Sequence, residues 1–229
     1  MDFSFGIITT GGVDDRILTI IESIEYLKIP NYEIIIVGNC GVQRSNVTVI
    51  AFDESIKRMW ITRKKNIITE HAKYENIVFL HDYVALDKNW YEGFKQFGNN
   101  FKVCMTRLED IHGNRHQDWV IIGDSGIVGS ECMIPYDMNL SKIQYMPGNY
   151  WIAKKSFMEQ FPLNENLIWG QGEDGEWSLR ITKQHQFSMN PYSTARYLKE
   201  KHRGYSECSE ATIKILNAIQ KYERFINNV

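Results

Sequence analysis

Four short apolar runs in the first half of the chain constrain its fold more than any other feature. They span residues 3–9, 33–37, 47–52 and 76–80, and two segments with helical spacing lie among them. The run from residue 33 to 37 is nearly continuous in β-branched side chains, as in strands that are buried on both faces of a sheet. This alternation predicts βα units, and therefore an α/β fold with a mostly parallel central sheet flanked by helices.

Helices are predicted at three places from spacing and end signals. The first begins near Asp14 and Asp15, which can cap it, and it stops before Pro30. The second covers residues 60–71, and the last begins after Ser209, another capping residue. The predicted inward faces are Ile17, Ile20, Ile21, Ile24 and Leu27 in the first helix, and Ile215, Leu216, Ile219, Tyr222 and Ile226 in the last.

The second half of the chain is less regular. Residues 101–106, 119–122 and 143–146 are predicted strands, and long loops join them. Loops of this length in a compact protein are commonly functional. We therefore expect these loops to shape the binding pocket.

The composition is that of a globular protein. Its 229 residues, 43% apolar and 13% aromatic, are enough for one substantial core, so a single domain over residues 1–229 is expected. The formal charge of -2 comes from 26 basic and 28 acidic residues mixed along the chain, which argues against nucleic acid as a partner. No apolar run approaches the roughly 20 residues of a membrane span, and the N-terminus lacks a basic signal region. We expect a cytoplasmic protein without an integral membrane segment; peripheral membrane association and the oligomeric state stay open.

The four cysteines are expected to be reduced, mostly buried thiols. Cys40, Cys104, Cys132 and Cys208 are widely spaced and form no CxxC pair. This spacing argues against a zinc ribbon or a redox dithiol. Reduced thiols agree with a cytoplasmic location.

An acidic pair at the start of a further predicted helix is the strongest candidate for chemistry. Glu173 and Asp174 follow Gly170 and Gly172, and Trp177 continues the helical pattern. A carboxylate in such a place can act as a general base or bind sugar hydroxyls. The alternative is purely structural, because the helix dipole favours acids in the first turn whatever the function.

Five segments, taken in chain order, form a larger pattern. They are the loop Thr9 to Gly12 after the first predicted strand, Asn39 after the second, Arg63-Lys64-Lys65-Asn66 near the start of the second helix, Phe79-Leu80-His81-Asp82-Tyr83, and Trp169-Gly170-Gln171-Gly172-Glu173-Asp174. Their order over nearly the whole chain resembles that of GT-A fold glycosyltransferases. The last segment looks like the WGGED segment of galactosyl- and N-acetylgalactosaminyltransferases and of chondroitin-type polymerases. Residues 147–153 resemble the glycine-containing segment that leads into it.

This resemblance implies a Rossmann-like GT-A fold with a small additional sheet in the acceptor half. Residues 1–100 would form the nucleotide-binding half, residues 101–206 the acceptor-binding half, and residues 207–229 a C-terminal helix. The implied function is metal-dependent transfer of a hexose or N-acetylhexosamine from a UDP-sugar to a glycan hydroxyl, with inversion. The implied setting is the synthesis of surface or capsular polysaccharide.

The resemblance also implies a nucleotide site at the ends of the first strands. Glycines lack Cβ, so the loop backbone can approach base and ribose, and the amide of Asn39 can offer both a donor and an acceptor to a pyrimidine. Solvated helix charge is the alternative for Lys64 and Lys65. The expected nucleotide-binding residues are Thr9, Thr10, Gly11, Gly12, Asn39, Arg63, Asn66, His81 and Asp82.

Relatives in that family hold a divalent cation with a DxD motif, and His81-Asp82-Tyr83 stands at the corresponding place. Because tyrosine replaces the final acid, Asp82 is the candidate ligand for Mn²⁺ or Mg²⁺. The resemblance offers His202 as a second ligand, and a neutral imidazole suits Mn²⁺ better. The alternative for His202 is a solvated basic loop. Its basic neighbours either contact a diphosphate or are solvated, namely Lys199, Lys201 and Arg203.

On the acceptor side, the resemblance gives Asp174 the role of general base. Trp169 is the expected surface for stacking on a sugar ring, whereas Trp177 is expected to pack its helix. The expected substrate-binding residues are Gly148, Asn149, Trp169, Gly170 and Glu173. Two other functions stay open: a nucleotidyltransferase that makes an activated sugar, and a noncatalytic carbohydrate-binding or scaffold protein derived from a transferase.

Overall fold

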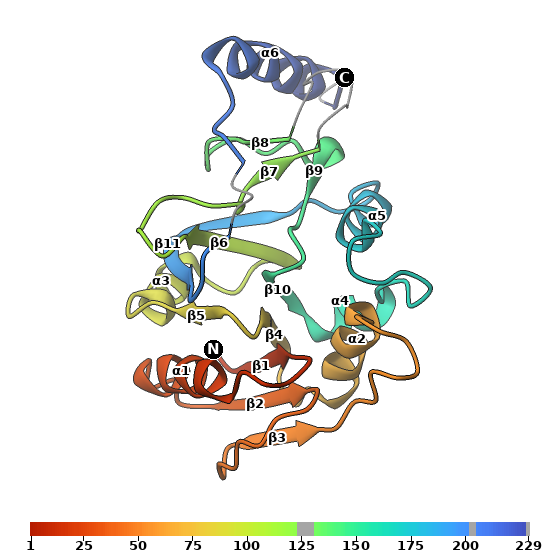
Figure 1. Cartoon of the computed structure of the whole chain (residues 1–229). Coiled ribbons are helices and arrows are strands. Elements are labelled where there is room, and N and C mark those ends of the chain that lie inside the picture. The colour runs from red at the N-terminus through yellow and green to blue at the C-terminus, as the bar shows by residue number, and fades with distance from the viewer. Residues whose placement is uncertain (123–130, 202–204, 228–229) are drawn as a thin grey trace.

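A curled eight-stranded sheet, flanked by helices, forms the centre of the protein (Figure 1). The computed structural model describes residues 1–122, 131–201 and 205–227; for residues 141 and 222–227 only the backbone is described. The strand order is β3-β2-β1-β4-β10-β6-β11-β5. The strands are β1 (Phe3–Ile8), β2 (Tyr32–Val37), β3 (Val47–Ile50), β4 (Asn76–His81), β5 (Val84–Leu86), β6 (Val103–Glu109), β10 (Tyr150–Lys154) and β11 (Ser188–Tyr197).

The first half of the chain builds the parallel part of this sheet. Strand β1 pairs in parallel with both β2 and β4, and β2 pairs in parallel with β3. Strand β10 then enters antiparallel between β4 and β6, and β11 runs parallel to β6 and antiparallel to β5. The predicted α/β fold is confirmed. Three strands of this sheet were not predicted: the short β5, and β10 and β11, whose positions depend on pairing with distant strands.

In the described part of the chain, six α-helices accompany the sheet. They are α1 (Asp14–Tyr26), α2 (Ile61–His71), α3 (Trp90–Phe97), α4 (Lys155–Gln160), α5 (Glu173–Ile181) and α6 (Glu210–Asn227). In Figure 1, α1 and α3 lie at the left of the strands, and α2, α4 and α5 lie at the right. None of the helices among the described residues combines the length and apolar character that a membrane span requires.

Helix α1 confirms its predicted inward face but not its predicted caps. Its four isoleucines are fully buried. The N-cap position is Val13, which makes no side-chain cap bond, and Asp14 and Asp15 lie in the first turn. Acids there interact favourably with the helix dipole without capping the backbone. The Oδ2 atom of Asp14 instead accepts a hydrogen bond from the backbone N–H of Gly41 at 3.2 Å.

A small antiparallel sheet lies beyond the central one, as predicted, with α6 above it (Figure 1). Its strands are β7 (Val120–Ile121), β8 (Cys132–Met133) and β9 (Gln144–Tyr145), and a short 3-10 helix, η1 (Ser141–Ile143), precedes β9. A disulfide between Cys132 and Cys208 ties β8 to the segment before α6. The prediction of four reduced thiols is therefore wrong for this pair, whereas Cys40 and Cys104 are free. Disulfides persist mainly in oxidising compartments, so this bond does not support the predicted cytoplasmic location, which stays a prediction.

The C-terminal helix follows its prediction in part. Ser209 caps α6, because its Oγ atom accepts a hydrogen bond from the backbone N–H of Thr212 at 3.2 Å. Leu216 is fully buried as expected, but Ile215 is 51% exposed, so its predicted inward orientation is wrong. The side chains of the last two predicted inward residues, Tyr222 and Ile226, lie outside the described part.

Stacked aromatic rings connect the central sheet to the helix that carries the acidic pair. The ring of Trp151 on β10 lies 4.4 Å from Phe79 on β4 and 4.6 Å from Trp177 on α5, between centroids. Trp177 also donates from its indole N–H to the carbonyl of Phe161 at 2.7 Å. Trp177 packs its helix as predicted. This packing fixes the start of α5 relative to the ends of β4 and β10.

Candidate functional site

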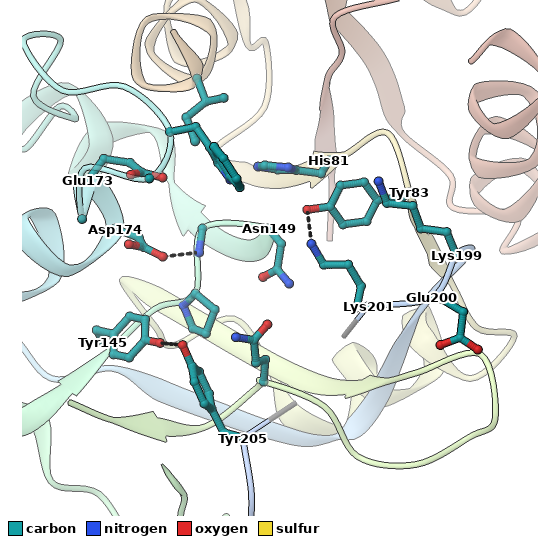
Figure 2. A pocket seen from close by; sticks show the side chains of 17 residues that line it. His81, Tyr83, Tyr145, Asn149, Glu173, Asp174, Lys199, Glu200, Lys201 and Tyr205 are labelled. Carbon is teal, nitrogen blue, oxygen red and sulfur yellow. Dashed lines mark hydrogen bonds between the residues drawn. The ribbon is translucent and has the colours of Figure 1, made fainter. Parts of the chain in front are cut away.

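Two adjoining cavities lie at the carboxyl ends of β1 and β4, beside the start of β10. Their volumes are about 540 Å³ and about 240 Å³. Figure 2 shows the side chains around the larger one. Both cavities are lined by Ile61, His81, Tyr83, Trp169, Lys199 and Lys201. One extended ligand can therefore occupy both, in the place where open α/β sheets commonly bind ligands.

The smaller cavity contains four of the predicted nucleotide-binding residues. Thr9, Thr10, His81 and Asp82 all line it. The hydroxyl of Thr9 donates to the Oδ2 atom of Asp82 at 2.7 Å and accepts from the backbone N–H of Gly11 at 3.0 Å. These bonds join the ends of β1 and β4 and orient the Asp82 carboxylate.

The glycine loop and Asn39 lie against each other but line neither cavity. Gly11 and Gly12 have positive φ angles of 101° and 71°, a region that favours glycine. A Cβ atom on Gly11 would lie 3.0 Å from the backbone oxygen of Asn39, so the loop needs a glycine to approach that residue. Their predicted contact with a nucleotide remains a prediction.

Two other predicted nucleotide-binding residues are not brought to the cavities. Asn66 is buried and donates to the carbonyl of Leu163 at 3.0 Å and to the carboxylate of Glu165 at 2.9 Å. Arg63 forms ion pairs with Glu70 and Glu165 at 2.5 and 3.1 Å. Both residues therefore hold the loop after α4.

Lys64 and Lys65 take the inward positions on α2 instead, each with 1% exposure, so the alternative of solvated helix charge is wrong for both. The ammonium of Lys64 donates to the carbonyl of Thr9 at 2.7 Å and pairs with Glu54. The sequence did carry a signal for this, because the two lysines share one helix face with Ile61 and Ile68 at spacings of three and four residues.

Asp174 faces the larger cavity from the first turn of α5. Gly172 precedes the helix in the left-handed conformation, with φ at 73°. The two Asp174 carboxylate oxygens accept hydrogen bonds from the backbone N–H groups of Gly148 and Gly175, both at 2.9 Å. The bond to Gly148 crosses to another segment, as Figure 2 shows, so Asp174 does more than neutralise the helix dipole. Burial raises the pKa of the neighbouring Glu173.

The carbonyl of the same Gly148 residue contacts a buried lysine. The ammonium of Lys65 donates to the Gly148 carbonyl and lies 5.8 Å from the centroid of the Trp151 ring. Burial lowers the pKa of Lys65 from 10.5 to about 8, although Asp174 and Glu173 favour its charged form. The larger cavity therefore has a buried cation directly behind its acidic pair.

Two polar atoms beside the cavities have no hydrogen-bond partner among the described residues. They are Nε2 of His81 and Oδ1 of the buried Asn149. Burial, with the charges of Lys65 and Lys201, lowers the pKa of His81 well below 6.5, so the ring is neutral. Buried polar atoms are normally paired, and a bound ligand or water can supply the missing bonds.

Lys199 and Lys201 project over the ring of Tyr83, with their ammonium groups 4.3 and 4.6 Å from its centroid. Burial and the charge of Lys199 lower the pKa of Lys201. Within the described residues, neither lysine has a carboxylate ion-pair partner. Two converging cations of this kind suit an anionic ligand such as a diphosphate.

The sequence did not single out the residues that form the wall beyond Asp174. Tyr145 and Tyr205 are joined through their hydroxyls at 2.9 Å, and Gln117 lines the same cavity. Figure 2 shows the two tyrosines below Asp174. In the sequence, the long loop that contains Gln117 was the one sign that this segment could shape the cavity. Tyr145 and Tyr205 are far apart in the chain, so only the folded structure brings them together.

The described residues supply one carboxylate for a cation at the strand ends. Among the described residues, none donates a hydrogen bond to the Oδ1 atom of Asp82. Burial and the charge of Asp82 raise the pKa of Tyr83, which stays a neutral phenol. No group of three His, Cys, Asp or Glu side chains suited to a metal occurs in the part that the structure describes. The other predicted ligand, His202, lies outside the described residues. A single carboxylate fits a Mg²⁺-type cation that takes its other ligands from phosphates and water.

Comparison with known proteins identifies the fold. No protein-family model and no curated protein matches the chain. GalNAc-T7 with UDP, GalNAc and Mn²⁺ has a similar structure, with a TM-score of 0.62 and 13% identity over 95% of this chain and 48% of that one. S. aureus TarS 1–349 with UDP-GlcNAc has a TM-score of 0.57 and 12% identity over 96% of this chain and 65% of that one. The chain thus has a GT-A-like glycosyltransferase fold, and it spans about half to two thirds of the length of these proteins.

Proposed function

We propose that the chain is an inverting glycosyltransferase that moves a hexose or N-acetylhexosamine from a UDP-sugar to a glycan hydroxyl. The observation that carries this proposal is the position of Asp174 in one of two joined cavities, while Thr9 and Asp82 lie in the other. A donor that spans both cavities would place its sugar between its diphosphate and a carboxylate base. The similar structures bind UDP, UDP-GlcNAc or GalNAc, which supports this class of donor.

In this mechanism Asp174 takes the proton from the acceptor hydroxyl as that oxygen attacks the anomeric carbon. Its two backbone hydrogen bonds hold the carboxylate in one orientation. Attack from the side opposite the leaving diphosphate inverts the anomeric centre. Trp169, which is 54% exposed on the rim of both cavities, offers a flat surface to the sugar ring.

On the donor side, Thr9 and Thr10 would approach the nucleotide, and Lys199 and Lys201 would contact the diphosphate. Asp82 would hold Mn²⁺ or Mg²⁺ together with the phosphates. Such a cation would neutralise the negative charge that develops on the leaving diphosphate. Glu173, Gly148, Asn149 and Gly170 line the larger cavity and would bind hydroxyls of the donor sugar or the acceptor.

A binding and turnover experiment tests this proposal. UDP binding is measured by calorimetry with and without Mn²⁺, and UDP release from a panel of UDP-hexoses and UDP-N-acetylhexosamines is measured with oligosaccharide acceptors. We expect Asp82→Ala to weaken the Mn²⁺-dependent UDP binding, whereas Asp87→Ala, a carboxylate outside both cavities, leaves it unchanged. No UDP binding and no UDP release by the wild type would contradict the proposal.

A further inference from the structure

Lys65 is an unusual residue for the interior of a protein. Its side chain is 1% exposed, and it forms no ion pair within 4.0 Å of any described carboxylate. Burying a charge without a close counterion is costly, so a structural need alone would be met better by an apolar side chain. The burial of Lys65 therefore indicates a functional role for this residue.

The backbone of Gly148 links this lysine to the proposed base. The Gly148 carbonyl accepts from the Lys65 ammonium, and the Gly148 N–H, in the preceding peptide unit, donates to the Oδ2 atom of Asp174. A Cβ atom placed on Gly148 would lie 3.4 Å from that oxygen and 3.5 Å from the Lys65 nitrogen. The two charged groups thus lie next to Gly148, and the backbone of this one residue contacts both of them.

Three other titratable groups surround Lys65 and Asp174 among the described residues. Glu173 adds a second carboxylate beside Lys65, and its pKa is raised by burial. His81, from β4, faces Lys65 and is neutral. Tyr145, from β9, faces Asp174 and is kept neutral by burial. Lys65 is therefore a buried cation that interacts electrostatically with Asp174 and Glu173. It carries its charge below a pKa of about 8.

We propose that Lys65 is a positioning residue: it fixes the backbone of Gly148, which in turn holds the Asp174 carboxylate in the orientation of a base. The inference rests on the proposed function, in which Asp174 is the base. Without the ammonium, the Gly148 carbonyl loses this partner, and the Gly148 N–H no longer holds the Oδ2 atom of Asp174 in one place. Turnover is then lost without a loss of donor binding.

Lys65→Gln and Lys65→Met test this proposal, because glutamine can still donate to the Gly148 carbonyl whereas methionine cannot. UDP binding is measured by calorimetry, and kcat and KM for UDP release are measured for each variant. We expect Lys65→Met to lower kcat roughly 10- to 100-fold, because a small misplacement of a catalytic group is enough for such a loss, while UDP affinity and KM stay close to the wild-type values. We expect Lys65→Gln to retain more of the wild-type kcat than Lys65→Met.

Lys64→Met is the matched control, since Lys64 is equally buried on the same helix but contacts Thr9 and Glu54. It is expected to weaken UDP binding, which Lys65→Met leaves unchanged. Lys65→Arg keeps a charged donor for the Gly148 carbonyl and is expected to retain most of the wild-type kcat, which provides a test if the neutral variants fail to fold. An unchanged kcat in Lys65→Met, or a loss of kcat in Lys65→Arg as large as that in Lys65→Met, would overturn the inference. No UDP release by the wild type would instead contradict the proposed function.

Discussion

Removing the disulfide between Cys132 and Cys208 is expected to lower the free energy of unfolding by about 4.5 kcal/mol. The bond closes a loop with a sequence separation of 76 residues, and the chain-entropy model gives this value for a loop of that length. A domain is typically stable by about 5–15 kcal/mol, so this one bond is a large part of the total.

The structure indicates that this effect arises mainly in the unfolded chain. Around the disulfide, the backbone N–H of Cys208 donates to the carbonyl of Met133 at 2.9 Å, and that of Met133 donates to the carbonyl of Ser206 at 2.9 Å. These bonds do not depend on the sulfur atoms. The folded variant should therefore keep the segment before α6 docked on β8, while the unfolded chain gains freedom.

Urea unfolding of the wild type and of the double variant Cys132→Ser, Cys208→Ser measures the difference, each with and without reductant. Reductant should destabilise the wild type and leave the double variant unchanged. Cys40→Ser, which replaces a free and half-buried thiol, serves as the control and should respond to reductant like the wild type. Thiol titration of the oxidised, denatured wild type should find two free thiols, those of Cys40 and Cys104. Four free thiols, or equal stability of wild type and double variant, would refute the reasoning.

Three further predictions concern the core, the rim of the site and its buried charge. Gly6→Ala should lower the free energy of unfolding by about 1–3 kcal/mol, because the added Cβ would lie 2.3 Å from Cγ2 of Ile68. Thermal unfolding checks this. The control is Gly175→Ala in helix α5, where the space is open and alanine is expected not to destabilise the protein. Trp169→Ala should raise KM about tenfold, because the sugar ring loses its stacking surface. The melting temperature should not change, since the side chain is 54% exposed. A lower melting temperature would contradict this prediction, because it would show that Trp169 packs in the core. The pKa of Lys65 is about 8 in the folded protein and 10.5 in the unfolded chain, so the unfolded chain binds more protons between these two values. The free energy of unfolding therefore rises with pH in this range, by at most about 3.4 kcal/mol. Denaturant titrations at several pH values should show this gain in the wild type and not in Lys65→Met.

The first half of the fold follows from the sequence because its strands are buried on both faces. Runs such as residues 33–37 leave no polar position for a solvent-facing side, so a central parallel strand is their natural place. Strand β11 gives no such signal. It contains Pro191 and mostly polar residues, and its register shifts between Asn190 and Thr194. Its place in the sheet depends on pairing with β6, which local sequence does not encode.

The candidate site was predictable to the extent that it is local. Glycines around Glu173 and Asp174 revealed the acidic pair, and the end of β4 revealed Asp82. On α2 the choice between Arg63 with Asn66 and Lys64 with Lys65 required knowing which helix face meets the sheet. The contacts of Lys65 with the Gly148 peptide join residues far apart in the chain, so only the folded structure brings them together.

The central claim is that Asp174 is the base of a UDP-sugar transferase, and Asp174→Asn tests it most directly. Asparagine keeps the size of the side chain and can still accept the hydrogen bond of one backbone N–H, but it cannot take a proton from an acceptor. We predict that the variant binds UDP as tightly as the wild type by calorimetry while its kcat for sugar transfer falls by roughly 10² to 10⁴. Transfer by Asp174→Asn at a rate close to that of the wild type would contradict the account.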